Sequence, residues 1–211
     1  MAVLSRIELI NEGKYRAGID ATNVELTTEF DMVTKDITGR YDILRGNAAA
    51  GALTSHASNN YLAVPSDFKG VEHMKASTTA APTVRNEVVM LEPEIFFSYA
   101  ISFGTSYIPT KGCYVPTEGR IYLNPFPSAD PSVTYYLWYT KYHPAVTTDA
   151  GAHILGEEFD ETIILGLAAY GAEMSEKYQR ALWFRQTYEE DLGIKATVKR
   201  KRLIRVEYPE M

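Results

Sequence analysis

A long stretch of regularly spaced apolar residues near the C-terminus predicts the helical framework of this chain. Between Gly156 and Leu192, apolar side chains recur every three or four positions, as they do along one face of a helix. An unbroken helix of this length would run to about 55 Å at about 1.5 Å per residue, so we expect a helical hairpin with a break near Ser175, which would cap the second helix. The apolar positions are Phe159, Ile163, Leu167, Tyr170, Met174, Tyr178, Ala181 and Tyr188.

A first, shorter helix is predicted close to the N-terminus. Ser5 and Glu8 have the spacing of a capping box, in which the side chain of each residue bonds to the backbone N–H of the other. The helix is expected to run to Ala17, because Gly18 tolerates the left-handed backbone that commonly ends a helix.

A second helix is predicted from another capping box, Thr22 to Glu25, to a point just before Gly46. Its apolar stripe and the stripe of the C-terminal hairpin both need apolar partners. We therefore expect residues 1–45 and residues 156–193 to pack together as one helical bundle. The apolar positions of the second helix are Leu26, Phe30, Val33, Ile37, Tyr41 and Leu44.

The sequence between the two helical regions changes character twice. Residues 46–60 contain few large apolar side chains, so burial cannot offset the entropy lost on ordering, and a surface loop is expected. Residues 61–146 contain short β-type runs separated by proline, glycine and threonine, which predicts an antiparallel β-rich insertion. The runs Val71–Ala76 and Val84–Met90 are expected strands, and Pro93 favours a short helix within Leu91–Tyr99.

A β-hairpin is predicted between Gly119 and Tyr142. Arg120–Leu123 and Ser132–Tyr142 have strand character, and the segment between them contains three prolines, which cannot donate to a central ladder. The second strand is apolar on both faces, so one face is expected in the core and the other against the chain's own helices or another chain. Val133, Tyr135, Leu137 and Tyr139 share one face, and Tyr136, Trp138 and Tyr142 share the other.

The net charge hides a contrast between the body of the chain and its C-terminal end. The formal charge of the full sequence is −6 at pH 7. Six basic residues and no acid fall between Lys195 and Arg205, so the remainder carries −12. Such a run is usually a solvated chain end, and the alternative is an arm for nucleic acid or an acidic protein surface.

Composition argues against several classes of protein. No run approaches the ~18 consecutive apolar residues of a membrane span, and the first residues lack the pattern of a cleaved secretory signal, so neither is expected. Cys113 is the only cysteine, which rules out an intrachain disulfide and a zinc site built from several cysteines.

The sequence contains no signature of a catalytic, metal or cofactor site. Its histidines form no ligand-type pair, and it has no phosphate-binding loop, nucleophile elbow or dinucleotide fingerprint. The acids at Glu157, Glu158, Asp160 and Glu161 are explained by the helix dipole. We therefore expect no enzyme activity and no metal or cofactor, the alternative being a small hydrolase assembled from dispersed residues. The histidines are His56, His73, His143 and His153.

The order of these pieces resembles the head-tail adaptor proteins of tailed bacteriophages over most of Ser5 to Leu192. The resemblance lies in the succession of patterns, since no single motif is diagnostic. The pieces are two N-terminal helices, the entry Tyr61–Phe68, the turn Gly119–Pro127, the strand Tyr135–Tyr139 closing at His143-Pro144, and Glu158-Phe159-Asp160 before a long helical end.

The resemblance implies an α+β subunit, a helical bundle with a β-rich insertion and an extended C-terminal arm over residues 194–211. It further implies a dodecameric ring beneath the portal protein, located in the neck of the virion and assembled in the host cytoplasm. Such a ring extends the DNA channel and offers an attachment site for tail or nozzle proteins. Genomic DNA would pass through it without sequence-specific binding, and no membrane would be involved.

Two sets of residues become candidate binding sites on this resemblance. The aromatic side chains Tyr136, Trp138 and Tyr142 are candidates for the interface between subunits. The arm that would reach the portal contains Lys195, Lys199, Arg200, Lys201, Arg202, Leu203, Ile204, Arg205, Val206 and Tyr208.

An alternative function is a nucleic-acid-binding module that acts through the basic run between Lys195 and Arg205.

The sequence departs from the family pattern in residues 46–60 and in several extra residues after Thr78. Contacts made by those segments cannot be inferred from the resemblance.

Overall fold

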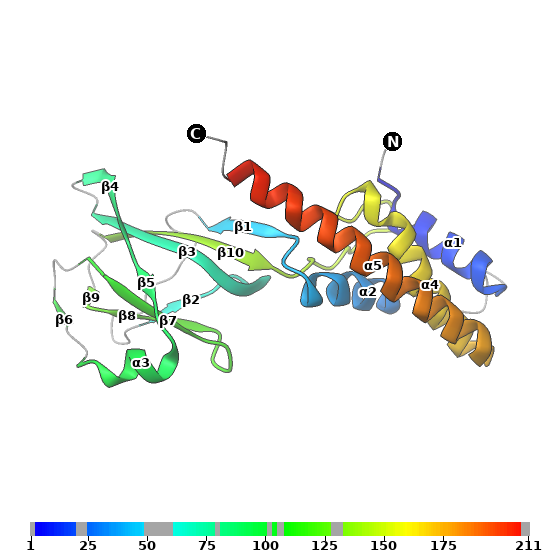
Figure 1. The fold of residues 1–211 in the computed structure, drawn as a ribbon, viewed down its shortest axis with the longest axis horizontal. Coiled ribbons are helices and arrows are strands. Elements are labelled where there is room, and N and C mark those ends of the chain that lie inside the picture. Colours follow the sequence, from blue (N-terminus) through cyan, green and yellow to red (C-terminus); the bar gives the residue numbers. More distant parts are fainter. Residues whose placement is uncertain are drawn as a thin grey trace. The chain divides into compact units, whose positions relative to one another are not determined.

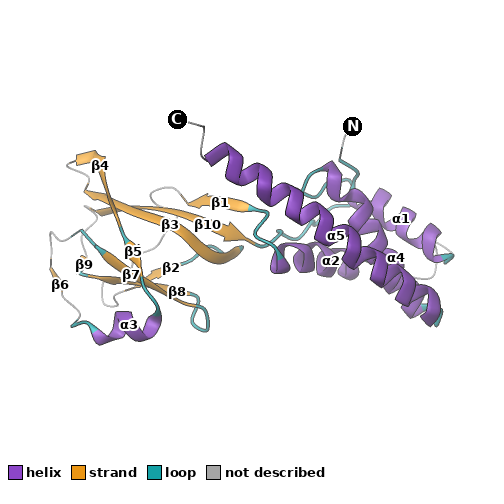
Figure 2. Cartoon of the chain, in the orientation of Figure 1, coloured by secondary structure: helices purple, strands orange, loops and turns teal. Residues whose placement is uncertain are grey.

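The computed structural model shows a mixed α+β chain that divides into two compact units. We call Met1–Leu44 with Tyr142–Met211 the helical unit and Arg45–Lys141 the β unit. Figure 1 follows the chain from one end to the other, and Figure 2 separates its helices from its strands. The structure describes residues 3–19, 25–48, 61–78, 81–100, 103–104, 108–127 and 133–207.

The helical unit is built from both ends of the chain, which confirms the expected α+β class with helices at both termini. A 3-10 turn, η1, precedes its central helix. That helix, α4, contacts α1, α2 and α5, and it is buried almost all round because its middle is apolar on every side. The elements are α1 (Arg6–Ala17), α2 (Thr27–Arg40), η1 (Glu157–Phe159), α4 (Asp160–Met174) and α5 (Tyr178–Glu207).

The first helix begins and ends where its capping residues predict. The Ser5 N–H donates to the Glu8 carboxylate at 2.8 Å, and the Ser5 hydroxyl donates to the same oxygen at 2.6 Å. These bonds lower the pKa of Glu8. Gly18 closes the helix with φ +70°, the left-handed conformation expected of it.

The second helix is shorter than its sequence pattern predicts. α2 begins at Thr27 and ends at Arg40, whereas the pattern predicted a helix up to Gly46, and residues 22–24 of the expected capping box lie outside the described residues. The chain leaves the helix because residues 45–48 pair with a strand, forming β1 (Arg45–Ala48). Gly46 is required there, since a Cβ would lie 2.4 Å from the Tyr139 ring. Residues 46–48 of the expected surface loop belong to β1 instead, and residues 49–60 are not described.

The long C-terminal stretch breaks near Ser175, as expected, although Ser175 plays a different part. It is the C-cap of α4, and α5 begins only at Tyr178. The turn between them places Glu176 at φ +58°, a conformation that a residue with a side chain rarely adopts. The two helices form the expected hairpin and contact each other along their lengths.

The C-terminal segment, expected to leave the bundle as an extended arm from residue 194, continues α5 as helix to Glu207. Lysine, arginine and leucine are good helix formers, and cations near a helix C-terminus complement the negative end of its dipole. Residues 208–211, which include Tyr208, are not described.

The β unit contains two four-stranded sheets and one short helix. The first sheet has the order β1-β10-β3-β4, and the second has the order β2-β8-β7-β5. The helix α3 (Pro93–Ser98) begins at the proline that predicted it. The other elements are β2 (Tyr61–Ala63), β3 (Phe68–Thr78), β4 (Ala81–Glu87), β5 (Val89–Met90), β6 (Phe103–Gly104), β7 (Lys111–Val115), β8 (Arg120–Asn124), β9 (Phe126–Pro127) and β10 (Val133–Lys141).

The hairpin predicted between Gly119 and Tyr142 is wrong. Both strands exist, but β8 pairs with β2 and β7 in one sheet, and β10 pairs with β1 and β3 in the other. A tight turn ending at Gly119, φ +63°, joins β7 to β8, so β8 finds its antiparallel partner immediately before it. β10 pairs along its whole length with the long strand β3.

One face of β10 lies in the core of the β unit, as its alternation predicts. Val133, Tyr135, Leu137 and Tyr139 are buried, and they pack with Leu62, Met74, Ile121 and Leu123 from both sheets. The opposite face of the strand is only partly covered.

Candidate functional site

The two described histidines of the helical unit lie close together and have structural partners. The rings of His143 and His153 are 6.4 Å apart. Nε2 of His153 lies 2.6 Å from Oδ1 of Asp160, and the Ile154 N–H donates to Nε2 of His143 at 3.1 Å. Asp160 also accepts a hydrogen bond from the Leu4 N–H, so this cluster ties the N-terminus to the start of α4. Sequence spacing did not indicate the pairing.

The acids at the start of α4 also have structural partners. Glu161 pairs with Arg16, which also pairs with Glu12 one turn before it on α1. Glu157 and Glu158 lie in η1. Among the residues that the structure describes, no three histidine, cysteine, aspartate or glutamate side chains are grouped to hold a metal ion.

The single cysteine is a core residue. Cys113 lies in β7 and is fully buried, and burial raises the pKa of its thiol. Burial therefore disfavours the reactive thiolate form of this cysteine.

Two of the candidate interface residues stand together on the outer face of β10. Tyr136 and Trp138 stack with ring centroids 6.5 Å apart, and the guanidinium of Arg85 lies 4.1 Å above the Tyr136 ring. His73 lies 5.3 Å from Trp138. These neighbours come from β3 and β4, so the partly exposed aromatic pair is bordered by strand side chains of the β unit.

The third candidate interface residue belongs to the other unit. Tyr142 is 40% exposed and begins the segment that returns to the helical unit, near Gly39 of α2. The three aromatic residues therefore do not form a single patch within either unit.

Lys195, the first basic residue of the predicted arm, contacts the helical bundle. Nζ of Lys195 donates to Asp191 at 2.8 Å and to Oγ1 of Thr162 on α4 at 3.3 Å, so this lysine helps to attach α5 to the bundle. Ala196 is the last buried side chain described along α5, and Val198 is already 45% exposed. Residues from Lys199 onward continue the helix.

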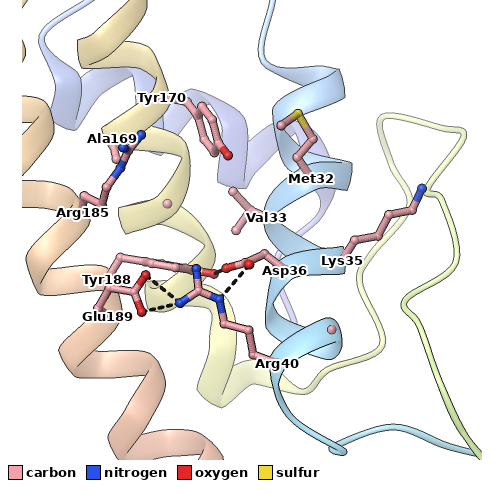
Figure 3. Close-up of a pocket in the computed structure, with 12 residues that line it drawn as sticks. Met32, Val33, Lys35, Asp36, Arg40, Ala169, Tyr170, Arg185, Tyr188 and Glu189 are labelled. Carbon is pink, nitrogen blue, oxygen red and sulfur yellow. Dashed lines mark hydrogen bonds and ion pairs between the residues drawn. The ribbon is translucent and has the colours of Figure 1, made fainter. Parts of the chain in front are cut away.

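A pocket that sequence reasoning missed lies between α2, α4 and α5 (Figure 3). It has a volume of about 670 Å³. Its apolar wall is formed by Val33, Gly166 and Ala169, with Tyr170 and Met32 beside them. A Cβ on Gly166 would meet Val33 at 2.8 Å, so this glycine lets α2 approach α4 closely.

A charged network borders the pocket on one side. Arg40 donates to Asp36 at 2.8 Å and to Glu189 at 2.7 Å, and the Tyr188 hydroxyl donates to Asp36 at 2.8 Å (Figure 3). The bonds to Glu189 and then Asp36 raise the pKa of Arg40. Burial, followed by the bond to Asp36, raises the pKa of Tyr188. The network links α2 to α5 beside the pocket.

Polar side chains also line the pocket, among them Lys35, Asp36, Tyr188 and Glu189. No histidine, cysteine, serine or threonine lies among the described residues that line it. The sequence signal that could have located it is Gly39 in α2 and Gly166 in α4, because a glycine leaves space beside a helix.

The comparisons with known proteins identify a family. The model of the family described as SU10 adaptor protein matches residues 5–206. No curated protein matches the chain. Across the described parts of the chain, the helices lack the combination of length and apolar character needed to cross a membrane.

Proposed function

The chain belongs to the SU10 adaptor protein family, a family of phage structural adaptors, and from this premise we propose that it forms the head-tail adaptor ring of a virion. Twelve copies assemble beneath the portal, in the neck, after synthesis in the host cytoplasm. The ring extends the DNA channel and provides the attachment site for tail or nozzle proteins. The observation that carries this proposal is the family match, which spans both units.

The charge distribution supports a role as a DNA conduit. Arg45–Lys141 contains seven basic and seven acidic residues, so the whole net charge of −6 belongs to the helical unit. A negatively charged wall repels phosphates and does not retain the passing duplex, whereas a basic wall would bind it. Genomic DNA would therefore move through the ring without sequence-specific contacts.

The C-terminal end of α5 is the proposed portal-binding arm. The helix continues beyond Ala196, its last buried residue described, and carries the run Lys199–Arg202 and then Arg205. Leu203 and Val206 continue the three-and-four spacing of Tyr188, Leu192 and Ala196, which are buried. An acidic, partly apolar groove on the portal would suit both the cations and the apolar residues.

The aromatic residues supply proposed contacts between copies. A closed ring needs two different surfaces on each subunit, and aromatic side chains are enriched in the centres of such interfaces. Tyr136 and Trp138 on the β unit, and Tyr142 on the helical unit, are partly exposed and available for this purpose.

The experiment that tests this function combines the purified full-length chain with purified portal protein and follows complex formation by sedimentation. A stable complex is expected, and electron microscopy should show a ring in register with the portal. Deleting Lys199–Met211 should abolish the complex while leaving the circular dichroism unfolding transition in place, because every described buried side chain is retained. If the full-length chain forms no complex at micromolar concentration, the proposal is wrong.

The basic run also favours a second candidate, a nucleic-acid-binding module. In that case the chain should retard DNA in a gel at low salt, and its affinity should fall steeply as salt rises. Unchanged DNA mobility at low salt would eliminate this candidate.

A further inference from the structure

The pocket between α2, α4 and α5 is an apolar depression that the described residues of its own subunit leave unfilled. Its volume of about 670 Å³ is within the range of pockets that enclose a large side chain or small ligand. The apolar wall of the pocket is formed by Val33, Gly166 and Ala169. Burying a large apolar side chain in this pocket would therefore be energetically favourable.

A stripe of exposed apolar side chains runs along the outer side of α5. Trp183 is 59% exposed, Ile194 is 67% exposed and Val198 is 45% exposed. Spacings of eleven and four residues place them on the same side of a helix with 3.6 residues per turn. Glu190 lies on this side too, seven residues after Trp183.

The stripe and the pocket lie on opposite sides of the same helix. The pocket is lined on α5 by Arg185, Tyr188 and Glu189. Each residue of an α-helix is rotated by about 100° around the helix axis, so the three pocket residues point roughly 180° away from Trp183 and Ile194. One helical unit therefore presents an apolar depression and an apolar projection that use different faces of α5, as a head-to-tail contact between identical subunits requires.

The charges around the two surfaces are complementary. Lys35 stands at the border of the pocket, is exposed, and makes no side-chain ion pair or hydrogen bond with another described residue. On the stripe, Glu190 is exposed and accepts a hydrogen bond from the neutral Gln186 but pairs with no cation among the described residues. In a contact between two copies, the Glu190 carboxylate of one copy would therefore meet the Lys35 ammonium of the other, and neither group has an ion-pair partner among the described residues of its own copy.

We propose that Trp183 of one copy inserts into the α2–α4–α5 pocket of the next copy, with Glu190 turned toward Lys35 of that neighbour. The proposal rests on the ring function and assigns the contact that closes the ring within the helical units. Trp183 serves as the anchor, because a large aromatic side chain that enters a preformed pocket contributes more to an interface than a flat contact. Ile194 and Val198 extend the contact along the helix.

Cross-linking between copies tests the contact directly. Full-length Met32→Cys and full-length Glu190→Cys, which both keep the Trp183 anchor, are mixed with portal and treated with a short bis-maleimide. Met32 borders the pocket and is 48% exposed, and the native Cys113 is buried, so the two new thiols should react selectively. Covalent dimers are expected in the mixture and not with either variant alone. Tyr15→Cys, at a 79% exposed position on α1, replaces Glu190→Cys in the control. A yield no higher than in this control overturns the proposal.

Blocking the pocket supplies an independent test. Gly39 lines the pocket, and a Cβ there would meet only Tyr142, at the ordinary contact distance of 3.8 Å. Gly39→Leu should therefore fill the mouth of the pocket and improve helix propensity in α2. Both Gly39→Leu and Trp183→Ala should raise the protein concentration needed for half-maximal ring assembly on the portal at least about tenfold. Tyr15→Ala should leave it unchanged.

The outcomes separate this contact from the proposed function. If the wild-type chain forms the ring on the portal and neither Gly39→Leu nor Trp183→Ala weakens it, the pocket contact is wrong and the adaptor function stands. If another segment occupies the pocket, Gly39→Leu weakens assembly while Trp183→Ala does not, and the assignment to Trp183 fails. If the wild-type chain forms no complex with the portal, both proposals fail together.

Discussion

Gly46 lies where the ring of Tyr139 passes directly against the backbone of β1. A Cβ at Gly46 would approach this ring to 2.4 Å, well inside van der Waals contact. The ring cannot move away easily, because it stacks on Phe68 at 5.4 Å and its hydroxyl donates to Asp67 at 3.0 Å. A single hydrogen atom in place of a side chain thus permits β1 to pair with β10.

The substitution Gly46→Ala should destabilise the β unit by about 1–3 kcal/mol, the usual cost of overpacking a filled site. Urea unfolding measures this cost. Gly70→Ala is the matched control, because its Cβ would meet Oγ1 of Thr140 at 3.4 Å, an ordinary contact within the same sheet. If Gly46→Ala is as stable as the wild type, the Tyr139 ring moves aside at little cost in free energy and the prediction is wrong.

Tyr139 also predicts a pH dependence of stability. Burial, and then the hydrogen bond to Asp67, raises its pKa from 10.0 to about 12. Above pH 10 the unfolded chain therefore loses this proton while the folded chain keeps it. The free energy of unfolding should consequently fall as pH rises from about 10 to about 12.

The measurement is the urea midpoint at about pH 9 and about pH 11. The midpoint should fall with pH in the wild type and fall less in Tyr139→Phe, which keeps the ring and removes the titrating hydroxyl. Because burial also raises the pKa of Tyr135, the variant should retain part of the dependence. An identical decrease in both proteins would contradict the assignment to Tyr139.

At the scale of elements, the turn between α4 and α5 decides how the hairpin folds. α4 ends at Met174, and the backbone reverses through Glu176 at φ +58° before α5 begins at Tyr178. The left-handed conformation costs a residue with a Cβ roughly 1 kcal/mol more than it costs glycine. The hairpin tolerates this cost because its two helices bury a continuous apolar face between them.

Replacing Glu176 with glycine should therefore stabilise the helical unit by roughly 0.5–1 kcal/mol, seen as a higher midpoint of thermal unfolding. Gln179→Gly provides the contrast, since glycine inside the first turn of α5 should cost up to about 1 kcal/mol. A loss of stability in Glu176→Gly would mean that the carboxylate makes a contact that outweighs the backbone strain.

At the scale of the whole molecule, charge is divided between a neutral β unit and a helical unit whose acidic body ends in a basic helix. Cations at the end of α5 are favoured by the helix dipole even in the isolated chain. The same cations form the proposed arm. A portal contact built on them should depend on salt, because screening weakens attraction between exposed charges.

Raising the salt concentration should therefore weaken the complex between this chain and the portal, as measured by its dissociation constant. A variant with glutamine at Lys199, Arg200, Lys201 and Arg202 should bind more weakly at low salt and show a shallower dependence on salt. Glutamine at Lys111 and Arg120 changes cations of the β unit, outside the arm and the pocket lining, and is the control. If the four-residue variant keeps the salt dependence of the wild type, the arm does not bind through its charges.

Local features of the sequence determined the helices well. The Ser5–Glu8 box, the glycine at 18 and the proline at 93 act on their immediate neighbours, so their effects can be worked out without knowing the fold. The alternation in β10 likewise specified which side chains enter the core. The order of such patterns was sufficient to indicate the family.

Tertiary structure decided what depends on partners distant in the chain. The pairing of β10 with β3, rather than β8, follows from contacts across some sixty residues, and no local pattern in either strand encodes the choice. The early end of α2 has the same origin, because residues 45–48 gain ladder hydrogen bonds with β10 that a further helical turn would forgo. Lys195 similarly became part of the bundle because Thr162 of α4 lies beside it. The pocket belongs to no single segment, since three helices form it, and only their packing brings Val33, Ala169 and Tyr188 around one space.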